Sequence, residues 1–431
     1  MAEVVNIGLI GFGNVGQAVY ELIRDNGAHI KEKTGFDLRI KRIAVRDSEK
    51  KRAADFDKNI ITEDAGEIFD DPEIMVVVEL IGGYEKAKDY VLKALKNGKY
   101  VVTANKLLMA KDGAELFEFA EKNNSDIYFE ASVAGAIPAV LPISLSMCAD
   151  KIESIHAIVN GTCNFILTRM SEGMAFPDAL KLAQEKGFAE SVPDLDINGT
   201  DAMQKLVILS SLSFGNRFRE EDVHVEGIGG IDSNDLKYAD DLGYRIKLLA
   251  IANLDADEKI ELTVAPFLVS KEHQLASVNN ELNAITIKGS YADELTFVGK
   301  GAGGKPTSSA VVADIINAAQ DKLNCFEGIH LIKLKGERRI KIKNIGDCER
   351  RFYVRLSALD KPGVVAKFSD IFSENRINIA SVIPKEDSPG NFVPVVVVLH
   401  KAKEKDVYKA ISEILKLEEI ESAKLLRFKD F

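Results

Sequence analysis

A glycine pattern near the N-terminus constrains the fold of this chain more than any other feature. The apolar run at residues 4–10 leads directly into Gly11, Gly13 and Gly16, spaced as G-x-G-x-x-G, and helical periodicity follows over residues 17–24. The first glycine permits a tight turn, the second leaves room for a pyrophosphate, and the third lets the helix pack on the sheet. The pattern therefore predicts a dinucleotide-binding loop made of Gly11, Phe12, Gly13, Asn14, Val15 and Gly16.

The next hundred or so residues repeat the strand and helix alternation that this loop begins. Strand-like runs occur at residues 40–45, 74–80, 100–103 and 127–130, and helical stretches at residues 87–96 and 107–122 lie between them. Strands that alternate with helices favour a parallel sheet covered by helices on both faces. We therefore predict an α/β domain at residues 1–132, with a doubly wound sheet of the Rossmann type.

The remainder of the chain predicts two further domains, as expected because 431 residues exceed what one hydrophobic core usually supports. After residue 132 the regular alternation stops, and helices at residues 179–186 and 201–212 predict an α+β domain at residues 133–345. We expect a linker near residues 345–350. The segment 350–431 then has the order strand, helix, strand, strand, helix, strand, which predicts a ferredoxin-like domain.

Charge and cysteine usage narrow the class of protein. The formal net charge of -11 argues against a broad surface for nucleic acid or anionic membrane, because both need an excess of Lys and Arg. The cysteines Cys148, Cys163, Cys325 and Cys348 form no C-x-x-C pair, so a structural zinc site is not expected. The sequence has no signal-peptide pattern and no apolar run of membrane-spanning length, and we therefore expect a cytoplasmic protein.

The end of the second predicted strand bears on which nicotinamide dinucleotide binds. Arg46 stands where an NAD-binding domain usually has an acidic residue, and a guanidinium there suits the 2′-phosphate of NADP. Asp47 follows directly and could serve the ribose hydroxyls of NAD. The sequence favours NADP and leaves NAD open.

Two lysines and a group of carboxylates are the candidate chemical groups. Lys106 begins a predicted helix at the carboxyl edge of the sheet, where a cation opposes the helix dipole, so contact with a substrate or cofactor is favoured. Further along, Asp201 and Lys205 share one helix face, and the carboxylates of Glu190 and Asp196 precede them. Helix capping and an exposed ion pair explain this second group equally well.

Several ordered motifs resemble homoserine dehydrogenase. They are TANK (residues 103–106), YFEASVAGAIP (128–138), NGTCNFIL (160–167), GFAES (187–191), DLDINGTDAMQKL (194–206), DLGYRIKLLA (241–250) and GKGAGGKPTSSAVVADI (299–315). The resemblance covers residues 4–331. It implies the reversible reduction of L-aspartate 4-semialdehyde to L-homoserine with NADPH or NADH. We further expect part of residues 300–331 to pack back on the first domain, and the middle domain to bind substrate and form dimers.

The resemblance also implies roles for particular residues. Lys205 and Lys106 would be the catalytic pair, in which Lys205 gives a proton to the developing alkoxide and Lys106 orients and polarises the substrate. The residues implied in substrate binding, besides Lys106, are Glu190, Asp196, Asp201 and Thr162. Those implied in cofactor binding, besides the glycine loop, Arg46 and Lys106, are Thr103, Gly187, Gly301 and Gly303.

A cation site and an effector site are implied in the same way. The run at residues 128–138 resembles the family's site for a monovalent cation such as sodium, with Glu130 and the carbonyls of Val133, Gly135 and Ile137 as oxygen ligands. The C-terminal segment, with Asp-Lys-Pro-Gly at residues 360–363, resembles an ACT domain, the amino-acid-binding module. Threonine would be the effector, with Gly363 and Asn378 as contacts, in a homodimer or homotetramer. A domain that only assembles subunits is the alternative.

Two other functions are compatible with parts of the sequence. A 2-hydroxy-acid dehydrogenase with a sensing tail would need a catalytic histidine, and the available His156, His224, His273 and His330 lie in no His-plus-acid motif. A non-catalytic NADP-binding sensor with an ACT module is the second alternative. Substitution of Lys205 by alanine separates an enzyme from a sensor, because only an enzyme would lose turnover.

Overall fold

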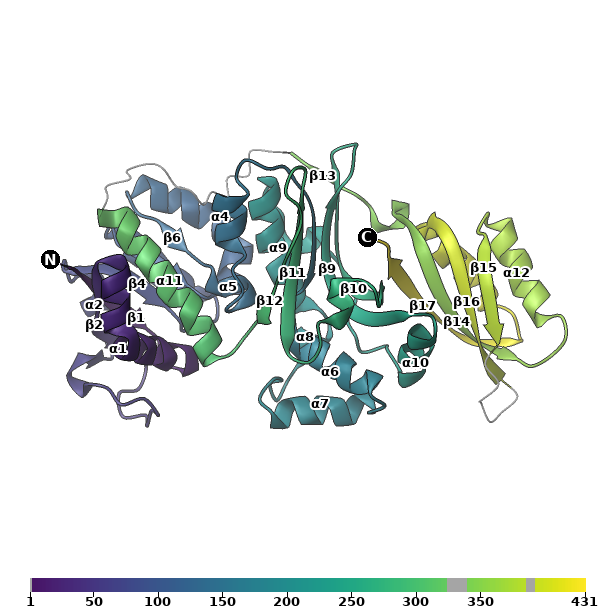
Figure 1. The fold of residues 1–431 in the computed structure, drawn as a ribbon, viewed down its shortest axis with the longest axis horizontal. Helices are drawn as coiled ribbons and strands as arrows, with labels where there is room; N and C mark the ends of the chain where they lie inside the picture. Colours follow the sequence, from purple (N-terminus) through teal and green to yellow (C-terminus); the bar gives the residue numbers. More distant parts are fainter. Residues whose placement is uncertain (1, 324–338, 385–391) are drawn as a thin grey trace. The chain divides into compact units, whose positions relative to one another are not determined.

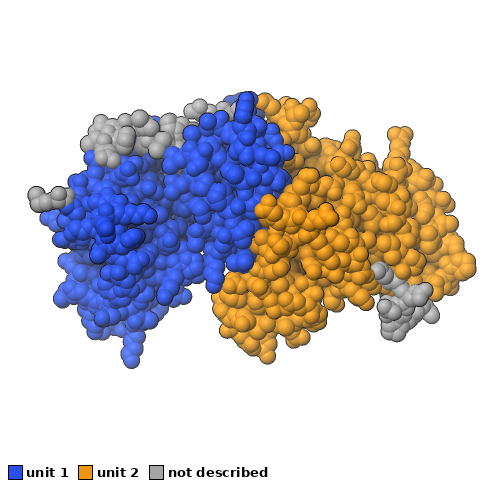
Figure 2. All heavy atoms as spheres, in the orientation of Figure 1, with its two compact units in different colours: residues 1–161, 201–222, 282–340 blue, residues 162–200, 223–281, 341–431 orange. Residues whose placement is uncertain are grey.

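The computed structural model describes residues 2–323, 339–384 and 392–431, and the chain divides into two compact units. The first unit contains residues 1–161, 201–222 and 282–340, and the second contains residues 162–200, 223–281 and 341–431 (Figure 2). No helix in the described residues combines the length and the apolar composition that crossing a membrane requires.

A six-stranded parallel sheet forms the centre of the first unit (Figure 1). Its order is β3-β2-β1-β4-β5-β6, with strands β1 (Glu3–Ile10), β2 (Phe36–Ala44), β3 (Ile61–Thr62), β4 (Ile74–Glu79), β5 (Tyr100–Thr103) and β6 (Ile127–Tyr128). All pairs in it are parallel. This is the strand order of a doubly wound dinucleotide-binding sheet, and the predicted fold class is confirmed.

Helices from distant parts of the chain pack against this sheet. They are α1 (Asn14–Thr34), α2 (Gly66–Phe69), α3 (Glu85–Lys96), α4 (Lys106–Lys122) and α11 (Gly304–Leu323). Helix α1 ends at Thr34 rather than at residue 24 as predicted, because Gly35 is the residue that adopts the left-handed conformation and caps it. Helix α11 contributes Val311 and Ile315 to the same core as Val5 and Ile7 of β1. Residues 324–331, part of the segment expected to pack back, lie outside the described residues.

The first unit also contains three antiparallel strands and two helices. Its strands are β7 (Ile152–Ile158), β11 (Leu282–Gly289) and β12 (Asp293–Lys300), with β11 in the centre. The helices are α5 (Ala131–Ala134) and, from residue 201 on, α9 (Thr200–Phe214). Helix α9 buries most of its residues, which places the charged side chains at its start in an apolar surrounding.

The second unit has helices α6 (Gly161–Ser171), α7 (Phe176–Glu185), α8 (Asp194–Ile197) and α10 (Ser233–Asp241) around the antiparallel pair β9 (Tyr244–Leu254) and β10 (Lys259–Ser270). Three strands lie parallel to β10, at successive positions along it: β13 (Lys341–Ile342), β8 (His224–Val225) and β17 (Ile420–Lys429). The last of these belongs to the C-terminal domain, so the backbone of that domain is hydrogen-bonded to the middle of the chain.

The C-terminal domain is ferredoxin-like, as predicted. Its elements are β14 (Glu349–Leu359), α12 (Val364–Glu374), β15 (Ile379–Pro384), β16 (Phe392–Lys403), α13 (Glu404–Ile414) and β17, and the antiparallel order is β17-β14-β16-β15. Strand β14 begins at Glu349, at the end of the segment near residues 345–350 where we expected a linker. Arg350 in this strand is buried, and its guanidinium lies 2.9 Å from Glu261 on β10.

Candidate active site

The glycine loop between β1 and α1 has two glycines fixed by packing and one left open. A Cβ at Gly16 would lie 2.4 Å from the carbonyl oxygen of Gly11, and a Cβ at Gly11 would lie 2.7 Å from that of Leu80. At Gly13 a Cβ would meet nothing within 4 Å. Open space above Gly13, directly before the N-terminus of α1, is what the close approach of a pyrophosphate requires.

The other predicted loop residues support this geometry. Phe12 is buried, and its ring packs edge-on against Phe56 at a centroid distance of 5.0 Å, so its side chain anchors the loop. Asn14 is the first residue of α1 and Val15 is partly buried in the sheet core. Phe12 and Val15 therefore pack inward, whereas Gly13 and Asn14 are exposed.

In the loop after β2, the two residues that bear on cofactor choice, Arg46 and Asp47, have different environments. Asp47 accepts hydrogen bonds from the backbone N–H groups of Glu49 and Lys50, so its carboxylate shapes a turn. Arg52 donates to the carbonyl oxygens of Asp47 and Lys50 and fixes the same loop. The exposed Arg46 makes no hydrogen bond within the part of the chain that the structure describes, and its guanidinium is available to a ligand.

The loop after β4 contains residues that the sequence analysis did not select. Gly82 and Gly83 both have positive φ, at 66° and 74°, with open space where a Cβ would lie. The buried carboxylate of Glu79 accepts hydrogen bonds from the N–H groups of Ile81 and Gly82. A Gly-Gly pair directly after an apolar strand is the same signal as the first glycine loop and could have identified them.

Thr103 lies at the end of β5, but its hydroxyl points into the protein. It is fully buried and donates to Oε2 of Glu79 at 2.7 Å. Asn105 then caps α4 by accepting from the N–H of Leu108, so that Lys106 becomes the first helical residue. Thr103 therefore supports the edge of the sheet through Glu79, and Lys106 projects from it.

One carboxylate brings the two predicted catalytic lysines together. Lys106 donates a short hydrogen bond to Oδ1 of Asp201, and the Nζ of Lys205 lies 2.9 Å from Oδ2. Asn160 donates to Oδ2 at 2.8 Å, and Lys205 also donates to the carbonyl oxygen of Val159 at 2.7 Å. Elements α4, α9 and the end of β7 thus meet at Asp201.

Burial and the two lysine charges shift the pKa of Asp201 in opposite directions. Asp201 is 4% exposed, and burial by itself would raise the pKa of its carboxyl group. The charges of Lys205 and Lys106 outweigh burial and hold the pKa well below its usual range. The carboxylate is therefore ionised between two ammonium groups, which leaves one net positive charge at the cluster.

The other predicted substrate residues belong to the second unit. Thr162 donates to the carbonyl oxygen of Phe188 at 2.6 Å, which closes the loop that begins at Gly187, where φ is +74°. Glu190 on this loop is exposed, and Asp196 on α8 is partly buried. The structure thus collects Thr162, Gly187 and Glu190 around one loop, and α8 follows it directly in the chain.

Of the two glycines predicted to bind the cofactor before α11, Gly301 and Gly303, only Gly301 is required by close packing. A Cβ at Gly301 would lie 1.9 Å from the side-chain nitrogen of Asn283. Gly303 has φ of +117° and only Pro306 within contact distance. A Cβ at the next residue, Gly304, would lie 3.0 Å from the carbonyl oxygen of Asn14, so the N-terminal ends of α1 and α11 are neighbours.

The predicted cation site is a tight buried loop around Glu130. Its carboxylate accepts hydrogen bonds from the N–H groups of Ala139, Val140 and Leu141, while burial outweighs these bonds and raises its pKa. Within the described residues, no backbone N–H outside a helix or strand donates to the carbonyl groups of Val133, Gly135 and Ile137. Backbone carbonyl oxygens are suitable ligands for a hard cation, whereas the Glu130 side chain already accepts hydrogen bonds from amide donors.

In the C-terminal domain the two predicted effector contacts differ in environment. Gly363 caps the N-terminus of α12 with φ of +91°, and no atom lies within 4 Å of where its Cβ would be. Asn378 is exposed, and its carbonyl oxygen accepts from the N–H of His400 at 2.9 Å.

Comparison with family models assigns most of the chain. Residues 11–130 match the model described as "Homoserine dehydrogenase, NAD binding domain", residues 138–316 match "Homoserine dehydrogenase", and residues 352–419 match "ACT domain".

Comparison with known proteins gives the same result over the full length. The homoserine dehydrogenase of Bacillus subtilis is 36% identical over 424 residues, which cover 98% of this chain and 97% of that protein. The homoserine dehydrogenase of Corynebacterium glutamicum is 39% identical over 427 residues, which cover 97% and 94%. The crystal structure of a homoserine dehydrogenase from Thiobacillus denitrificans superposes with a TM-score of 0.91 at 36% identity, covering 99% of each chain. A hyperthermophilic archaeal homoserine dehydrogenase in complex with NADPH covers 74% of this chain and 98% of its own, with a TM-score of 0.62 at 29% identity.

Proposed function

The chain belongs to the homoserine dehydrogenase family of NAD(P)-dependent oxidoreductases, and we propose that Lys106, Asp201 and Lys205 form its catalytic centre. The reaction interconverts L-aspartate 4-semialdehyde and L-homoserine. The observation that carries the proposal is the buried carboxylate of Asp201, which binds both lysines.

In the reduction direction Lys205 is the proton donor. The bound nicotinamide supplies a hydride to the aldehyde carbon, and the negative charge that then develops on the aldehyde oxygen needs a proton. An ammonium group has three N–H bonds, and Lys205 uses two of them on Val159 and Asp201. We assign the third to the substrate oxygen.

Lys106 orients and polarises the substrate. Its side chain is 39% exposed, compared with 11% for Lys205, so it can reach a ligand from the carboxyl edge of the sheet. A second positive charge beside the developing alkoxide stabilises the transition state more than the neutral aldehyde. The side chain of Asp201, already bound to three donors, acts by positioning the lysines.

Glu190, Asp196 and Thr162 are proposed to bind the amino-acid part of the substrate. Glu190 and Asp196 supply carboxylates for the substrate ammonium group, because Glu190 is exposed on the loop that begins at Gly187 and Asp196 is partly exposed on α8. Thr162 holds the loop from Gly187 through the carbonyl of Phe188.

The cofactor is proposed to be NADP, bound along the glycine loop. Gly13 and the N-terminal ends of α1 and α11 surround the place for the pyrophosphate, together with Gly11, Gly16, Gly301 and Gly303. Arg46 is free to pair with a 2′-phosphate, whereas Asp47 is used in a turn. The NADPH complex of the archaeal relative supports this choice.

A monovalent cation such as sodium is proposed at the loop of residues 130–137. The carbonyl oxygens of Val133, Gly135 and Ile137 would hold it, and Glu130 would contribute through the loop that its carboxylate fixes. Its role there would be structural, since it would brace the segment between β6 and β7.

The C-terminal domain is proposed to regulate the enzyme. The ACT domain belongs to a type that typically binds amino-acid effectors, and threonine, bound near Gly363 and Asn378, is proposed as the inhibitor. A homodimer or homotetramer and a cytoplasmic location are proposed as well. The described cysteines, Cys148, Cys163 and Cys348, form no disulfide bond with one another, which is compatible with a reducing compartment.

The test is a spectrophotometric assay of homoserine-dependent reduction of NADP and of NAD, with and without threonine. We expect reduction with NADP to be faster, and threonine to lower the rate. An absence of absorbance change with both dinucleotides would contradict the proposed catalytic centre.

A further inference from the structure

A buried ion-pair cluster joins the C-terminal domain to the middle of the second unit. The guanidinium of Arg427 on β17 is fully buried and binds two carboxylates, Glu226 and Glu404, with Nη1 2.8 Å from Oε2 of Glu226. Tyr408 donates from its hydroxyl to Glu226 at 3.2 Å. Glu404 and Tyr408 lie on α13 of the C-terminal domain, whereas Glu226 directly follows β8.

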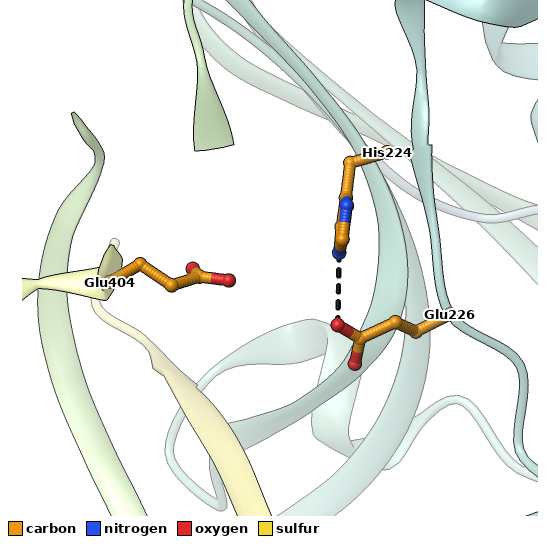
Figure 3. Close-up of side chains that lie close together, drawn as sticks. All are labelled: His224, Glu226 and Glu404. Atoms are coloured by element: carbon orange, nitrogen blue, oxygen red, sulfur yellow. Dashed lines mark hydrogen bonds and ion pairs between the residues drawn. The ribbon is translucent and has the colours of Figure 1, made fainter. Parts of the chain in front are cut away.

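This cluster is not a metal site, although a histidine and two carboxylates converge there. His224, Glu226 and Glu404 point toward one another, and one ligand atom of each lies within 4.8 Å of the others (Figure 3). The guanidinium of Arg427 already bridges both carboxylates and supplies the positive charge that a metal would bring. The pKa of the Glu226 carboxyl is held well below its usual range, chiefly by His224 and Arg427 against the effect of burial.

The residues that follow Glu226 are in close backbone contact with the C-terminal end of helix α8. The N–H of Ile228 donates to the carbonyl oxygen of Ile197, the last residue of α8, at 2.9 Å. Gly227 is so close that a Cβ there would lie 2.1 Å from the same oxygen and 2.7 Å from the Cα of Asn198. The segment therefore sets the position of the C-terminal end of α8.

The same segment is anchored a second time, further along. Arg355 on β14 donates to Asp232 and, at 2.7 Å from Nε to Oδ1, to Asp235. Tyr353 adds a hydrogen bond to Asp235 at 3.3 Å. Residues 226–235, which include glycines at 227, 229 and 230, are thus held at both ends by arginines of the C-terminal domain.

We propose that Glu226 and Gly227 are positioning residues for substrate binding: Arg427 holds Glu226, and the segment that follows holds helix α8 and its carboxylate Asp196 in place. The inference rests on the proposed role of Asp196 in binding substrate. The C-terminal domain thereby supports the substrate site, whether or not an effector is bound to it. Asn198 also lies only three residues before Asp201 in the chain.

Two matched pairs of variants of the full-length protein test the proposal. Glu226→Gln removes the negative charge through which Arg427 holds the segment that contacts α8. Glu404→Gln removes the other carboxylate that Arg427 binds; Glu404 is also buried, but it lies outside this segment. Gly227→Ala pushes on α8 without any change of charge. Gly229→Ala is its control, because a Cβ there would lie 3.7 Å from the Ile197 side chain, an ordinary contact distance.

We expect Glu226→Gln and Gly227→Ala to raise the KM for homoserine by about tenfold. Because these residues act on substrate binding through α8, kcat should stay within about twofold and the Kd for NADP should not change. The two controls should leave KM within about twofold. Hydrogen exchange of peptides that cover residues 190–200 should be faster in Glu226→Gln and Gly227→Ala, and unchanged in the controls. The conservative variant Glu226→Asp keeps the negative charge, so its KM should lie between those of the wild type and Glu226→Gln.

Asp196→Asn separates a failure of this inference from a failure of the proposed substrate site. If Asp196→Asn leaves KM unchanged, the substrate role of Asp196 is wrong, and the exchange data alone then decide whether the segment positions α8. If Glu226→Gln and Glu404→Gln change KM and exchange equally, or if Gly227→Ala matches Gly229→Ala, the positioning role is overturned.

Discussion

Lys205 lies one helical turn after Asp201 on α9, and its Nζ is 2.9 Å from Oδ2 of that carboxylate. On an exposed helix such a pair contributes only about 0.3–0.5 kcal/mol. Here Asp201 is buried and shared with Lys106 from α4, so the pair joins two helices and gathers two ammonium groups at one point.

Replacement of Lys205 by methionine should lower kcat by about 10²–10⁴-fold, the usual contribution of a positioned general acid. Methionine keeps most of the length of the lysine side chain but has no proton to give. The Kd for NADP, measured by fluorescence titration, should change little. Lys181→Met, at an exposed position of α7, serves as the control, and a Lys205→Met enzyme with normal turnover would remove Lys205 from the mechanism.

Replacement of Asp201 by asparagine should lower the free energy of unfolding at pH 7 by about 3 kcal/mol, because two ammonium groups then face each other without a buried counter-charge. The pKa of Asp201 is lowered in the folded state, so its stabilisation is complete above the ordinary carboxyl pKa of about 4 and decreases as the pH falls below that value.

Urea unfolding of the wild type and of Asp201→Asn between pH 7 and pH 3 measures this effect. The difference in unfolding free energy should stay constant down to about pH 4 and shrink below it. Glu221→Gln, which removes an exposed carboxylate with 69% of its side-chain surface accessible, should show no such difference. A difference that grows toward low pH would contradict the assignment.

The glycine loop offers a contrast between folding and binding. Gly16→Ala places a Cβ 2.4 Å from a backbone oxygen, so it should lower the unfolding free energy by about 1–3 kcal/mol. Gly13→Ala meets open space, so its Tm should equal that of the wild type while its Kd for NADP rises by about tenfold or more. Equal cofactor affinity in Gly13→Ala would show that the pyrophosphate lies elsewhere.

Arg46 is expected to decide between the two dinucleotides. Arg46→Ala should raise the KM for NADP by about ten- to hundredfold, because a charged hydrogen bond to the 2′-phosphate is lost. The KM for NAD, which has no 2′-phosphate, should change little. Lys51→Ala, on the same exposed loop, is the control. If both variants affect NADP and NAD equally, Arg46 contributes only general positive charge.

Threonine inhibition is expected to depend on the exposed Asn378. Asn378→Ala should raise the threonine concentration needed for half-maximal inhibition by about five- to tenfold, as for the loss of one or two hydrogen bonds. Asn375→Ala, on the same domain but hydrogen-bonded to Glu413, is the control, and inhibition curves at fixed homoserine measure the difference. An unaltered curve for Asn378→Ala would exclude this contact.

The amino-acid sequence by itself determined the dinucleotide-binding sheet, the ferredoxin-like domain and the family. Glycine spacing and hydrophobic periodicity are local signals, and the motifs around Lys106 and Lys205 are contiguous stretches, so no knowledge of distant contacts was needed. The sequence also identified Asp201 and Lys205 as a pair on one helix face, but it could not distinguish an exposed pair from a buried one.

Only the tertiary structure decided which of these groups share a partner. Asp201 binds Lys106, which is far away in the chain, and Asn160, which the sequence analysis did not select. Similarly, Arg350 lay at the end of the expected linker and Arg427 was not selected from the sequence, yet both are buried ion-pair centres. Burial and long-range pairing depend on how separate segments pack, and the energy of a charge depends mainly on burial, which no local pattern encodes.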